Sequence, residues 1–328
     1  MPDDLPPLPE PDRPPFRLLP WLAKWLVLLL SCATVAASVF AFCDQHHWSA
    51  RMVTPFRPQL MLLGLGLAAA AWWLRSGWPT RFVALAAVAV NLWVIWPWLT
   101  PHSGARPDAT FTLLSWNTWR DHPDPLAAIA AVRDSGVDVA LLCELPDELR
   151  EQQRLDIPGY QTRVHDEYAV AVRNGGPVEL LTSGLPRPPN CLAAVVRFQQ
   201  QEIRLLCSHD TRPTSSFGCH CQDYRTQVVK QWLEASPLPA VLVGDCNQTP
   251  WCPRLSEFVA QTGLRDTSLQ RGLTYTYPGD VPIVGRLIGI PIDQCLLTTD
   301  LACESTWVGD AAGSNHRPLR ATIGFAPP

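Results

Sequence analysis

Polar residues with catalytic potential recur along the second two thirds of the chain, where each ends an apolar run typical of a buried strand. In chain order they are Asn117, Glu144, His209, Asp245 with Asn247, Asp293, and Asn315 with His316. Carboxylates and amides bind hard cations, and a histidine beside a carboxylate can act as a general base. Because a rigid sheet fixes the loops at its strand ends, this ordered series predicts one hydrolytic site.

Each of these residues, taken alone, has an ordinary structural explanation. Asn117 could be a turn residue, Glu144 a solvated helix cap, and His209 a loop histidine with its hydrogen bonds satisfied. The segment GSNHRP at 313–318 could likewise be a plain polar turn. The prediction therefore rests on the order of the series and on no single member.

The elements that would position these residues alternate between strands and helices. Buried strands are expected at 111–117 and 137–145, and further apolar runs with turn residues between them follow. Helical spacing is found at 125–136, 221–235 and 251–262. Because some strands are joined by helices and others by hairpins, we expect an α/β sandwich built around two sheets.

The segments that carry the polar residues resemble a known family. In order, SWNTWR, LLCELP, LLCSHDTRP, VGDCNQTP, IPIDQCLL and GSNHRP are similar to signatures of the endonuclease/exonuclease/phosphatase superfamily, which has the DNase I-like fold. The resemblance covers about residues 110–326 and implies a catalytic domain there, a four-layer α/β sandwich. The preceding helices, with the stretch TYTYP…GIPIDQ, further resemble its membrane-attached bacterial branch.

The resemblance implies a phosphoric ester hydrolase that depends on Mg²⁺ or Mn²⁺. It assigns metal binding to Glu144, with Asn117 beside it and Asn315 close to the ion. Family members usually carry aspartate where this chain has Asn315, so we expect an active enzyme with weakened or altered metal affinity. A poorly active member is the alternative.

The same resemblance implies the catalytic roles. Asp245 and Asn247 would position the water and the phosphate, and His209 would donate to the phosphoryl group. His316 would take the proton of the water, held in its productive tautomer by Asp293. Three arginines of these segments are predicted to bind the substrate: Arg120, Arg212 and Arg317.

The first hundred residues differ sharply from the rest. Residues 1–20 are rich in proline and predict a disordered tail, 21–100 predict a transmembrane region, and 101–109 predict a linker. Three apolar runs predict about three membrane helices, near 25–43, 60–74 and 82–99. A signal peptide followed by buried soluble helices is the alternative.

The distribution of basic residues predicts the orientation in the membrane. One side of a three-helix topology would hold Arg13, Arg17, Lys24, Arg75 and Arg81. The other side would hold Arg51, Arg57 and Arg106. This bias favours a multi-pass protein of the bacterial cytoplasmic membrane, with its catalytic domain outside the cytoplasm. Such a location would permit disulfides among the eleven cysteines.

The composition limits the classes of substrate and partner that the protein is expected to bind. The formal charge of −4 and the lack of a basic, aromatic-interleaved run argue against a general nucleic-acid binder. The segment FGCHCQD lacks a second ligand pair at zinc-finger spacing. A hydrolase attached to a bilayer meets lipid-linked phosphates, so we expect such a substrate. The sequence indicates no specific protein partner. The alternatives are a nuclease acting on DNA or RNA and a weakly active phosphate-binding membrane protein.

Overall fold

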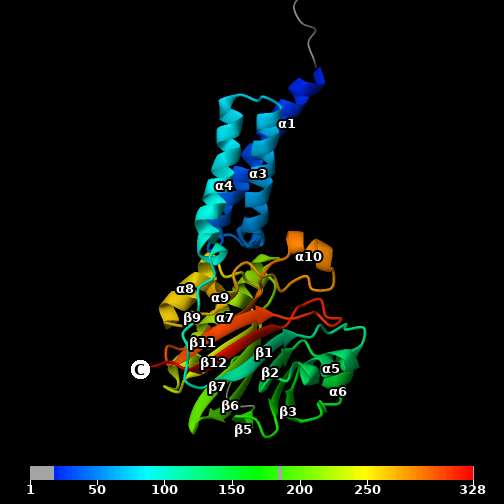
Figure 1. Ribbon diagram of the computed structural model, residues 1–328, viewed down its shortest axis with the longest axis vertical. Helices are drawn as coiled ribbons and strands as arrows, with labels where there is room; N and C mark the ends of the chain where they lie inside the picture. The colour runs from blue at the N-terminus through cyan, green and yellow to red at the C-terminus, as the bar shows by residue number, and fades with distance from the viewer. Residues whose placement is uncertain (1–17, 184–186, 328) are drawn as a thin grey trace, which may run out of the picture.

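A broad α/β body and a narrower helical bundle make up the protein, and the bundle projects from one end of the body (Figure 1). The computed structural model describes residues 18–183 and 187–327. The predicted tail at 1–20 lies outside the described residues up to position 17, and residues 18–20 already belong to the first helix.

Two six-stranded mixed sheets form the body within the described residues. The first has the order β11-β12-β1-β2-β4-β3 and the second has the order β5-β6-β7-β8-β10-β9. The first sheet consists of β1 (Phe111–Asn117), β2 (Val139–Cys143), β3 (Tyr160–His165), β4 (Tyr168–Arg173), β11 (Leu301–Val308) and β12 (Leu319–Phe325). The second consists of β5 (Val178–Ser183), β6 (Cys191–Phe198), β7 (Gln201–His209), β8 (Ala240–Asp245), β9 (Arg265–Asp266) and β10 (Asp293–Leu297).

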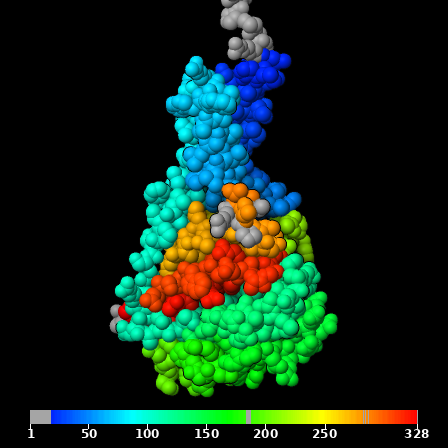
Figure 2. All heavy atoms as spheres, turned by 45° about the vertical axis from the view of Figure 1, so that its right-hand side comes forward, coloured from blue at the N-terminus to red at the C-terminus, as the bar shows by residue number. Residues whose placement is uncertain are grey.

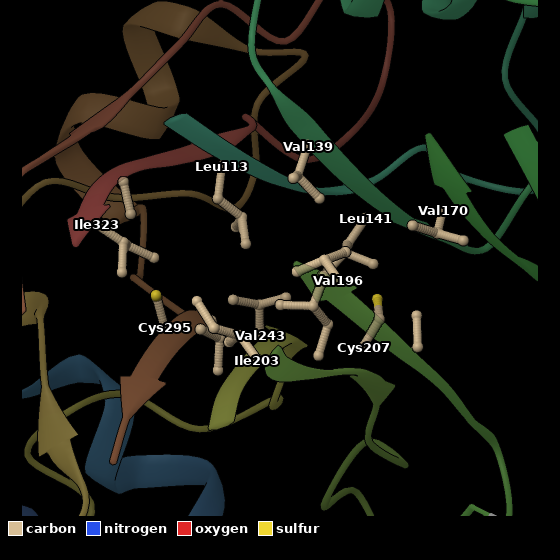
Figure 3. Packing of buried hydrophobic residues seen from close by; sticks show 14 of the residues in the cluster. Leu113, Val139, Leu141, Val170, Val196, Ile203, Cys207, Val243, Cys295 and Ile323 are labelled. Carbon is tan, nitrogen blue, oxygen red and sulfur yellow. The ribbon is translucent and has the colours of Figure 1, made fainter. Parts of the chain in front are cut away.

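The two sheets pack face to face, with helices on their outer faces. Side chains such as Leu113 and Leu141 of the first sheet meet Val196 and Val243 of the second in a fully apolar interior (Figure 3). Because side chains alternate along a strand, Leu114 and its neighbours face the other way and pack on a helix. The predicted four-layer sandwich is therefore confirmed.

The helices of the body follow strands of both sheets, and α7 and α8 pack on the outer face of the second. Those following strands of the first sheet are α5 (Pro125–Ser135) and α6 (Asp147–Glu151). Those of the second are α7 (Ser216–Glu234), α8 (Pro253–Thr262), α9 (Ser268–Arg271) and α10 (Pro282–Ile288). In α5, the side chain of Asp124 accepts from Leu126 N and Ala127 N, and Gly136 ends the helix in the left-handed region. These are the start and stop signals that the sequence shows.

The bundle is formed by α1 (Leu18–Phe40), α3 (Arg57–Trp73) and α4 (Trp78–Leu99). Short turns η1 (Ala41–Cys43) and η2 (Thr54–Phe56) and helix α2 (Trp48–Val53) form its base. Only two helices in the described part of the chain are long and apolar enough to cross a membrane, the spans Leu18–Cys43 and Trp78–Leu99. The prediction of about three such helices is wrong in that count, because α3 has only 17 residues, or about 26 Å.

The bundle buries several polar residues among small and apolar ones, while many of its large apolar residues are exposed. Asn91 is fully buried, and its amide donates to Ser38 Oγ at 2.7 Å while Arg57 Nη1 donates to Asn91 Oδ1 at 3.4 Å, so that one network joins the helices. Leucines and tryptophans such as Trp73 and Trp93 face outward. A bundle in water has the opposite arrangement, because its apolar side chains are buried.

Specific contacts join the base of the bundle to the body. Arg51 forms a bidentate pair with Asp223 of α7, at 3.0 and 3.2 Å. Trp251 Nε1 donates to the Thr54 carbonyl at 3.0 Å, and Trp98 Nε1 donates to Ser268 Oγ at 2.9 Å. The bundle is therefore seated on α7, α8 and α9.

All eleven cysteines fall within the described residues, and each is a free thiol. Burial raises the pKa of several of them, including Cys252 and Cys303, to about 12. The possible disulfides of an extracytoplasmic domain are thus not formed in this structure.

A buried carboxyl at this junction predicts a pH-dependent stability. Asp44 is buried, and burial raises its pKa to about 6 against the opposing charges of Arg51 and Arg254. In the folded protein the pKa of Asp44 lies above its ordinary value of 3.8. The protonated carboxyl therefore stabilises the fold fully below pH 3.8, and this stabilisation is lost as the pH rises through 6. Asp44→Asn should therefore stabilise the full-length protein at pH 8, by on the order of 3 kcal/mol, and change little at pH 4.

Thermal unfolding of both proteins in detergent at the two pH values measures this difference. Asp121→Asn, at an exposed position, is the matched control. An equal effect of Asp44→Asn at both pH values would show that the carboxyl is not the titrating group.

Candidate active site

Strand pairing brings the predicted residues of the first sheet to one edge. Strands β1 and β2 are parallel, and Asn117 lies opposite Cys143, so Asn117 and Glu144 leave the sheet side by side. Strand β12 is antiparallel to β1, so the chain just before β12, with Asn315 and His316, arrives at the same edge.

Strand pairing in the second sheet likewise brings its predicted residues together at one edge. Strands β7 and β8 are parallel with His209 opposite Asp245, and β10 is antiparallel to β8 with Asp293 also opposite Asp245. Gly244 precedes Asp245 with φ +136°, and a Cβ there would lie 1.9 Å from the Ser208 carbonyl oxygen. Only glycine fits this position, which explains part of the VGD motif.

His316 lies between two buried carboxylates. Its Nδ1 is 2.9 Å from Asp293 Oδ2, and its Nε2 is 3.5 Å from Asp245 Oδ2. The ring of Tyr277 lies 5.0 Å from the imidazole ring, between centroids. The sequence-based pairing of His316 with Asp293 thus has the geometry of a histidine oriented by an acid.

Burial and charge perturb the pKa values of this group. Burial raises the pKa of Asp245 to about 6, helped by the charge of Asp293 and opposed by that of His316. For Asp293, burial is outweighed by the charge and hydrogen bond of His316, which hold its pKa below the ordinary value. Burial alone would lower the pKa of His316, but Asp293 and Asp245 raise it to about 9.

His209 forms a second acid–imidazole group beside the first. Its Nε2 is 3.3 Å from Glu144 Oε1 and 3.8 Å from Asp245 Oδ2, and its Nδ1 is 3.8 Å from Glu167 Oε1. Burial opposes protonation of His209, but Glu167, Asp245 and Glu144 raise its pKa on balance. Hydrogen bonds and charge attraction from His209 and Arg120 lower the pKa of Glu167 to about 2.

The two amides nearest Asp245 are held firmly. Asn117 Nδ2 donates to Asp245 Oδ2 at 3.2 Å, and Asn117 Oδ1 accepts from the Trp119 amide at 2.9 Å. Asn247 adopts a positive φ of 48°, and its backbone amide donates to Asp245 Oδ1 at 2.8 Å. Its Nδ2 donates to the carbonyl of Asp210 at 2.6 Å.

Asn315 differs from the other amides. Its Oδ1 is buried and has no hydrogen-bond partner among the described residues. Its backbone carbonyl accepts from the Gly279 amide at 2.7 Å. A buried carbonyl oxygen without a donor is unfavourable unless a ligand completes it.

The predicted arginines do not share one environment. Arg120 and Arg212 line a cavity of about 440 Å³ together with His209, and Arg120 pairs with Glu167 at 2.9 Å. Arg317 instead directs its guanidinium to the backbone carbonyls of Gly309, Tyr275 and Val308. The structure thus places two of the three at the cavity and uses the third to hold loops together.

Three residues at the site were missed by the sequence-based prediction. Glu167 contacts His209 from the turn between β3 and β4, where nothing in the local pattern indicates function. Asp210 is paired with Arg225 at 2.8 Å, and its place directly after His209 could have indicated it. Thr276 Oγ1 accepts from the Asp293 amide at 3.2 Å and so helps to fix the acid.

The donor atoms at this edge fit a hard cation. Mg²⁺ needs only one or two carboxylates and keeps several waters. Glu144 supplies a carboxylate, and Asn117 and Asn315 supply amide oxygens, of which the one on Asn315 is buried without a donor. Across 18–183 and 187–327, no group of three or more His, Cys, Asp and Glu is arranged to hold a metal ion by itself.

The comparison with protein families decides the identity of this domain. The model of the endonuclease/exonuclease/phosphatase family matches residues 114–316, from inside β1 to His316. The chain belongs to the endonuclease/exonuclease/phosphatase family. The predicted superfamily and the prediction of an enzyme that hydrolyses phosphoric esters are thereby confirmed.

Solved structures with the same fold include several members of this family. An endonuclease/exonuclease/phosphatase family protein from Bacteroides thetaiotaomicron is 15% identical, with a TM-score of 0.54, and 68% of this chain covers 100% of it. D. rerio TDP2 complexed with a single-strand DNA product is 18% identical, with a TM-score of 0.52 and coverage of 66% and 100%. A mannosyl-6-phosphatase of B. thetaiotaomicron is 14% identical, with a TM-score of 0.50 and coverage of 66% and 100%. A search of curated proteins finds no match.

The geometry of the family's site in this chain predicts how His316 titrates. In the metal-free protein, the imidazole should titrate near 9, because two buried carboxylates face it. Asp293→Asn should lower this pKa by about one to three units, since burial then outweighs the remaining charge. Titration of the histidine ring resonances by NMR measures both values.

Asp156→Asn, at an exposed carboxylate remote from the site, is the control and should leave the titration unchanged. A pKa of His316 that is the same with and without the Asp293 carboxylate would refute the pairing.

Proposed function

We propose that this protein is a membrane-anchored, divalent-metal-dependent phosphoesterase that acts on a lipid-linked phosphate or pyrophosphate. The proposal rests first on the buried pair of His316 and Asp293, at the edge where Glu144 and the open oxygen of Asn315 also lie. Such an arrangement combines a base with oxygen ligands, which phosphoryl transfer to water requires.

In this proposal, Glu144, Asn117 and Asn315 would hold Mg²⁺ or Mn²⁺, which would supply positive charge beside the phosphoryl oxygens. The neutral form of His316 takes a proton from the attacking water through Nε2, while Asp293 keeps the proton on Nδ1 and stabilises the imidazolium that results. Asp245, within 3.5 Å of His316 Nε2, orients the water.

The remaining polar groups act on the phosphate. Asn247 keeps one amide hydrogen for a phosphoryl oxygen, because its other donor bond goes to the Asp210 carbonyl. His209, with its raised pKa, donates to the phosphoryl group. Arg120 and Arg212 attract the substrate at the wall of the cavity.

The inverted polarity of the bundle supports anchoring in a bilayer. Ser38, Arg57 and Asn91 are buried in its interior, whereas its outer surface is rich in leucine and tryptophan. The two candidate spans, in α1 and α4, both end at the base of the bundle (Figure 1), and the shorter α3 connects them within the bundle.

The arginines at the two ends of the bundle support an orientation in the bacterial cytoplasmic membrane in which the α/β body lies outside the cytoplasm. At the base, Arg51 is bound by Asp223 and Arg57 by Asn91 and Ser38, so these two guanidiniums are used within the protein. The far end carries Arg75 and Arg81. The positive-inside rule therefore favours the far end on the cytoplasmic side.

The position of the cavity supports a lipid-linked substrate. Gly218 and Phe217, at the start of α7, line it together with His209. The next residue, Cys219, accepts a hydrogen bond from Arg51 of the bundle base at 3.2 Å. The cavity wall is thus continuous with the part of the molecule that meets the membrane.

A panel of substrates tests the proposal. Full-length protein in nanodiscs with Mg²⁺ should hydrolyse an isoprenyl pyrophosphate in preference to single-stranded DNA. His316→Ala should lower the rate about a hundredfold or more, because it removes the base. The control His220→Ala, at an exposed position on α7, should retain the wild-type rate.

Preference for DNA would favour the nuclease alternative. Equal rates for wild type and His316→Ala, with phosphate still bound, would favour the weakly active binding protein.

Asn315 generates a separate prediction about the metal. Asn315→Asp replaces a neutral amide oxygen with a charged one, and affinity for hard cations rises with ligand charge. The Mg²⁺ concentration for half-maximal activity should therefore fall about tenfold. A metal titration of the hydrolysis rate measures it, and an unchanged midpoint would remove Asn315 from the ligand set.

A further inference from the structure

The segment between α9 and β10 joins the active site to the base of the bundle. At the site, the Arg317 amide donates to the Thr276 carbonyl at 2.8 Å, and the Tyr277 ring packs against His316. The Gly279 amide donates to the Asn315 carbonyl at 2.7 Å. This end of the segment is therefore fixed by the residues that surround the base.

The other end of the segment is fixed by the bundle. Ile290 pairs with Tyr277 through hydrogen bonds of 2.7 and 3.1 Å, which closes the segment into a loop with α10 at its tip. The carbonyl of Gly289 accepts from Gln59 Nε2, on the first turn of α3, at 3.0 Å. Figure 1 places α10 beside the foot of the bundle.

Helix α10 exposes an apolar face. The exposed fractions of Ile283 and Leu287 are 82% and 66%, and at a spacing of four residues both side chains lie on one side of the helix. The opposite side carries Gly285, where a Cβ would lie 2.8 Å from the Tyr275 ring and 2.7 Å from the Pro278 carbonyl oxygen. The close approach at Gly285 seats the helix on the body, and Ile283 and Leu287 face outward. In Figure 2 the orange segment that contains α10 lies on the surface directly below the blue bundle.

Other exposed apolar side chains occur at the base of the bundle. Trp48 and Met52 of α2 and Phe56 of η2 are exposed there. Gln59, bonded to Gly289 at the end of α10, follows Phe56 by three residues. The apolar face of α10 thus lies near the exposed apolar residues at the base of the proposed membrane anchor. Exposed apolar surface of this kind, beside a membrane helix, matches a bilayer rather than water.

We propose that α10 is an interfacial helix whose Ile283 and Leu287 lie in the boundary between headgroups and acyl chains. The inference rests on the proposed anchoring of the bundle in a bilayer. As a consequence, the segment between α9 and β10 holds the active-site edge of the sheets, which carries His316 and Asn315, at the depth of the lipid phosphate groups. The partner recognised is the lipid surface itself, and the substrate reaches the site without leaving it.

Fluorescence in single-chain nanodiscs tests the placement without any need for catalysis. In a full-length background with Cys32, Cys43 and Cys221 changed to Ser, Ile283→Cys is labelled with an environment-sensitive dye. The discs contain phosphatidylglycerol and phosphatidylethanolamine, with or without spin-labelled lipid. We expect emission shifted to the blue and quenching by the spin label. Leu126→Cys, 72% exposed on α5, is the matched control and should show neither.

Emission typical of water and no quenching at position 283 would overturn the proposal, whatever the protein hydrolyses. One chain in each disc excludes a second copy of the protein as the source of shielding. Quenching without any hydrolysis would leave this placement standing and refute the proposed function instead.

Activity provides a second, independent measurement. The double substitution Ile283→Glu with Leu287→Glu should reduce hydrolysis of an isoprenyl pyrophosphate in the disc about tenfold, because charge disfavours the interface. Hydrolysis of a water-soluble aryl phosphate should stay at the wild-type rate. Leu126→Glu should change neither rate, and an equal loss on both substrates in the double variant would contradict an interfacial role.

Discussion

The structure depends on the close placement of two buried carboxylates. Asp245 and Asp293 lie opposite each other in the antiparallel pairing of β8 and β10, and each is only 1% exposed. Two like charges on directly opposed residues repel each other strongly in a medium of low dielectric constant. His316 resolves the conflict, because its two ring nitrogens face one carboxylate each. Burial and the mutual charges of these three groups together perturb their pKa values.

This requirement also joins the two sheets. His316 comes from the first sheet and the two acids from the second, so the charges are balanced only when the sheets are packed. Trp116 Nε1 donates to the His316 carbonyl at 3.0 Å, and Ser314 Oγ donates to the Asn117 carbonyl at 2.8 Å. These bonds fix the loop before β12 on the end of β1. The apolar interior supplies most of the driving force for packing, while the polar edge fixes how the sheets are aligned.

Sequence could predict the strand-end residues because each lies next to an apolar run, after it in the case of Asn117, Glu144, His209 and Asp245, and before it in the case of Asp293 and His316. Strand pairing then brings Asn117, His209 and Asp293 together without any further signal. Glu167 and the guanidinium of Arg317 could not be predicted in this way, because their partners lie on segments distant in the chain. Helix α10 was missed for another reason. Its seven residues are too few for a recognisable period, and its apolar side chains face outward.

The charges at the site explain how asparagine can stand at position 315. Four carboxylates already converge there, those of Glu144, Glu167, Asp245 and Asp293, against the two imidazoles and Arg120. A fifth carboxylate would raise the repulsion that His316 must offset. The amide keeps an oxygen at the position without adding charge, and that oxygen is buried without a donor. An unpaired buried carbonyl costs about 1–3 kcal/mol, so the fold bears this cost at the point where a cation would remove it.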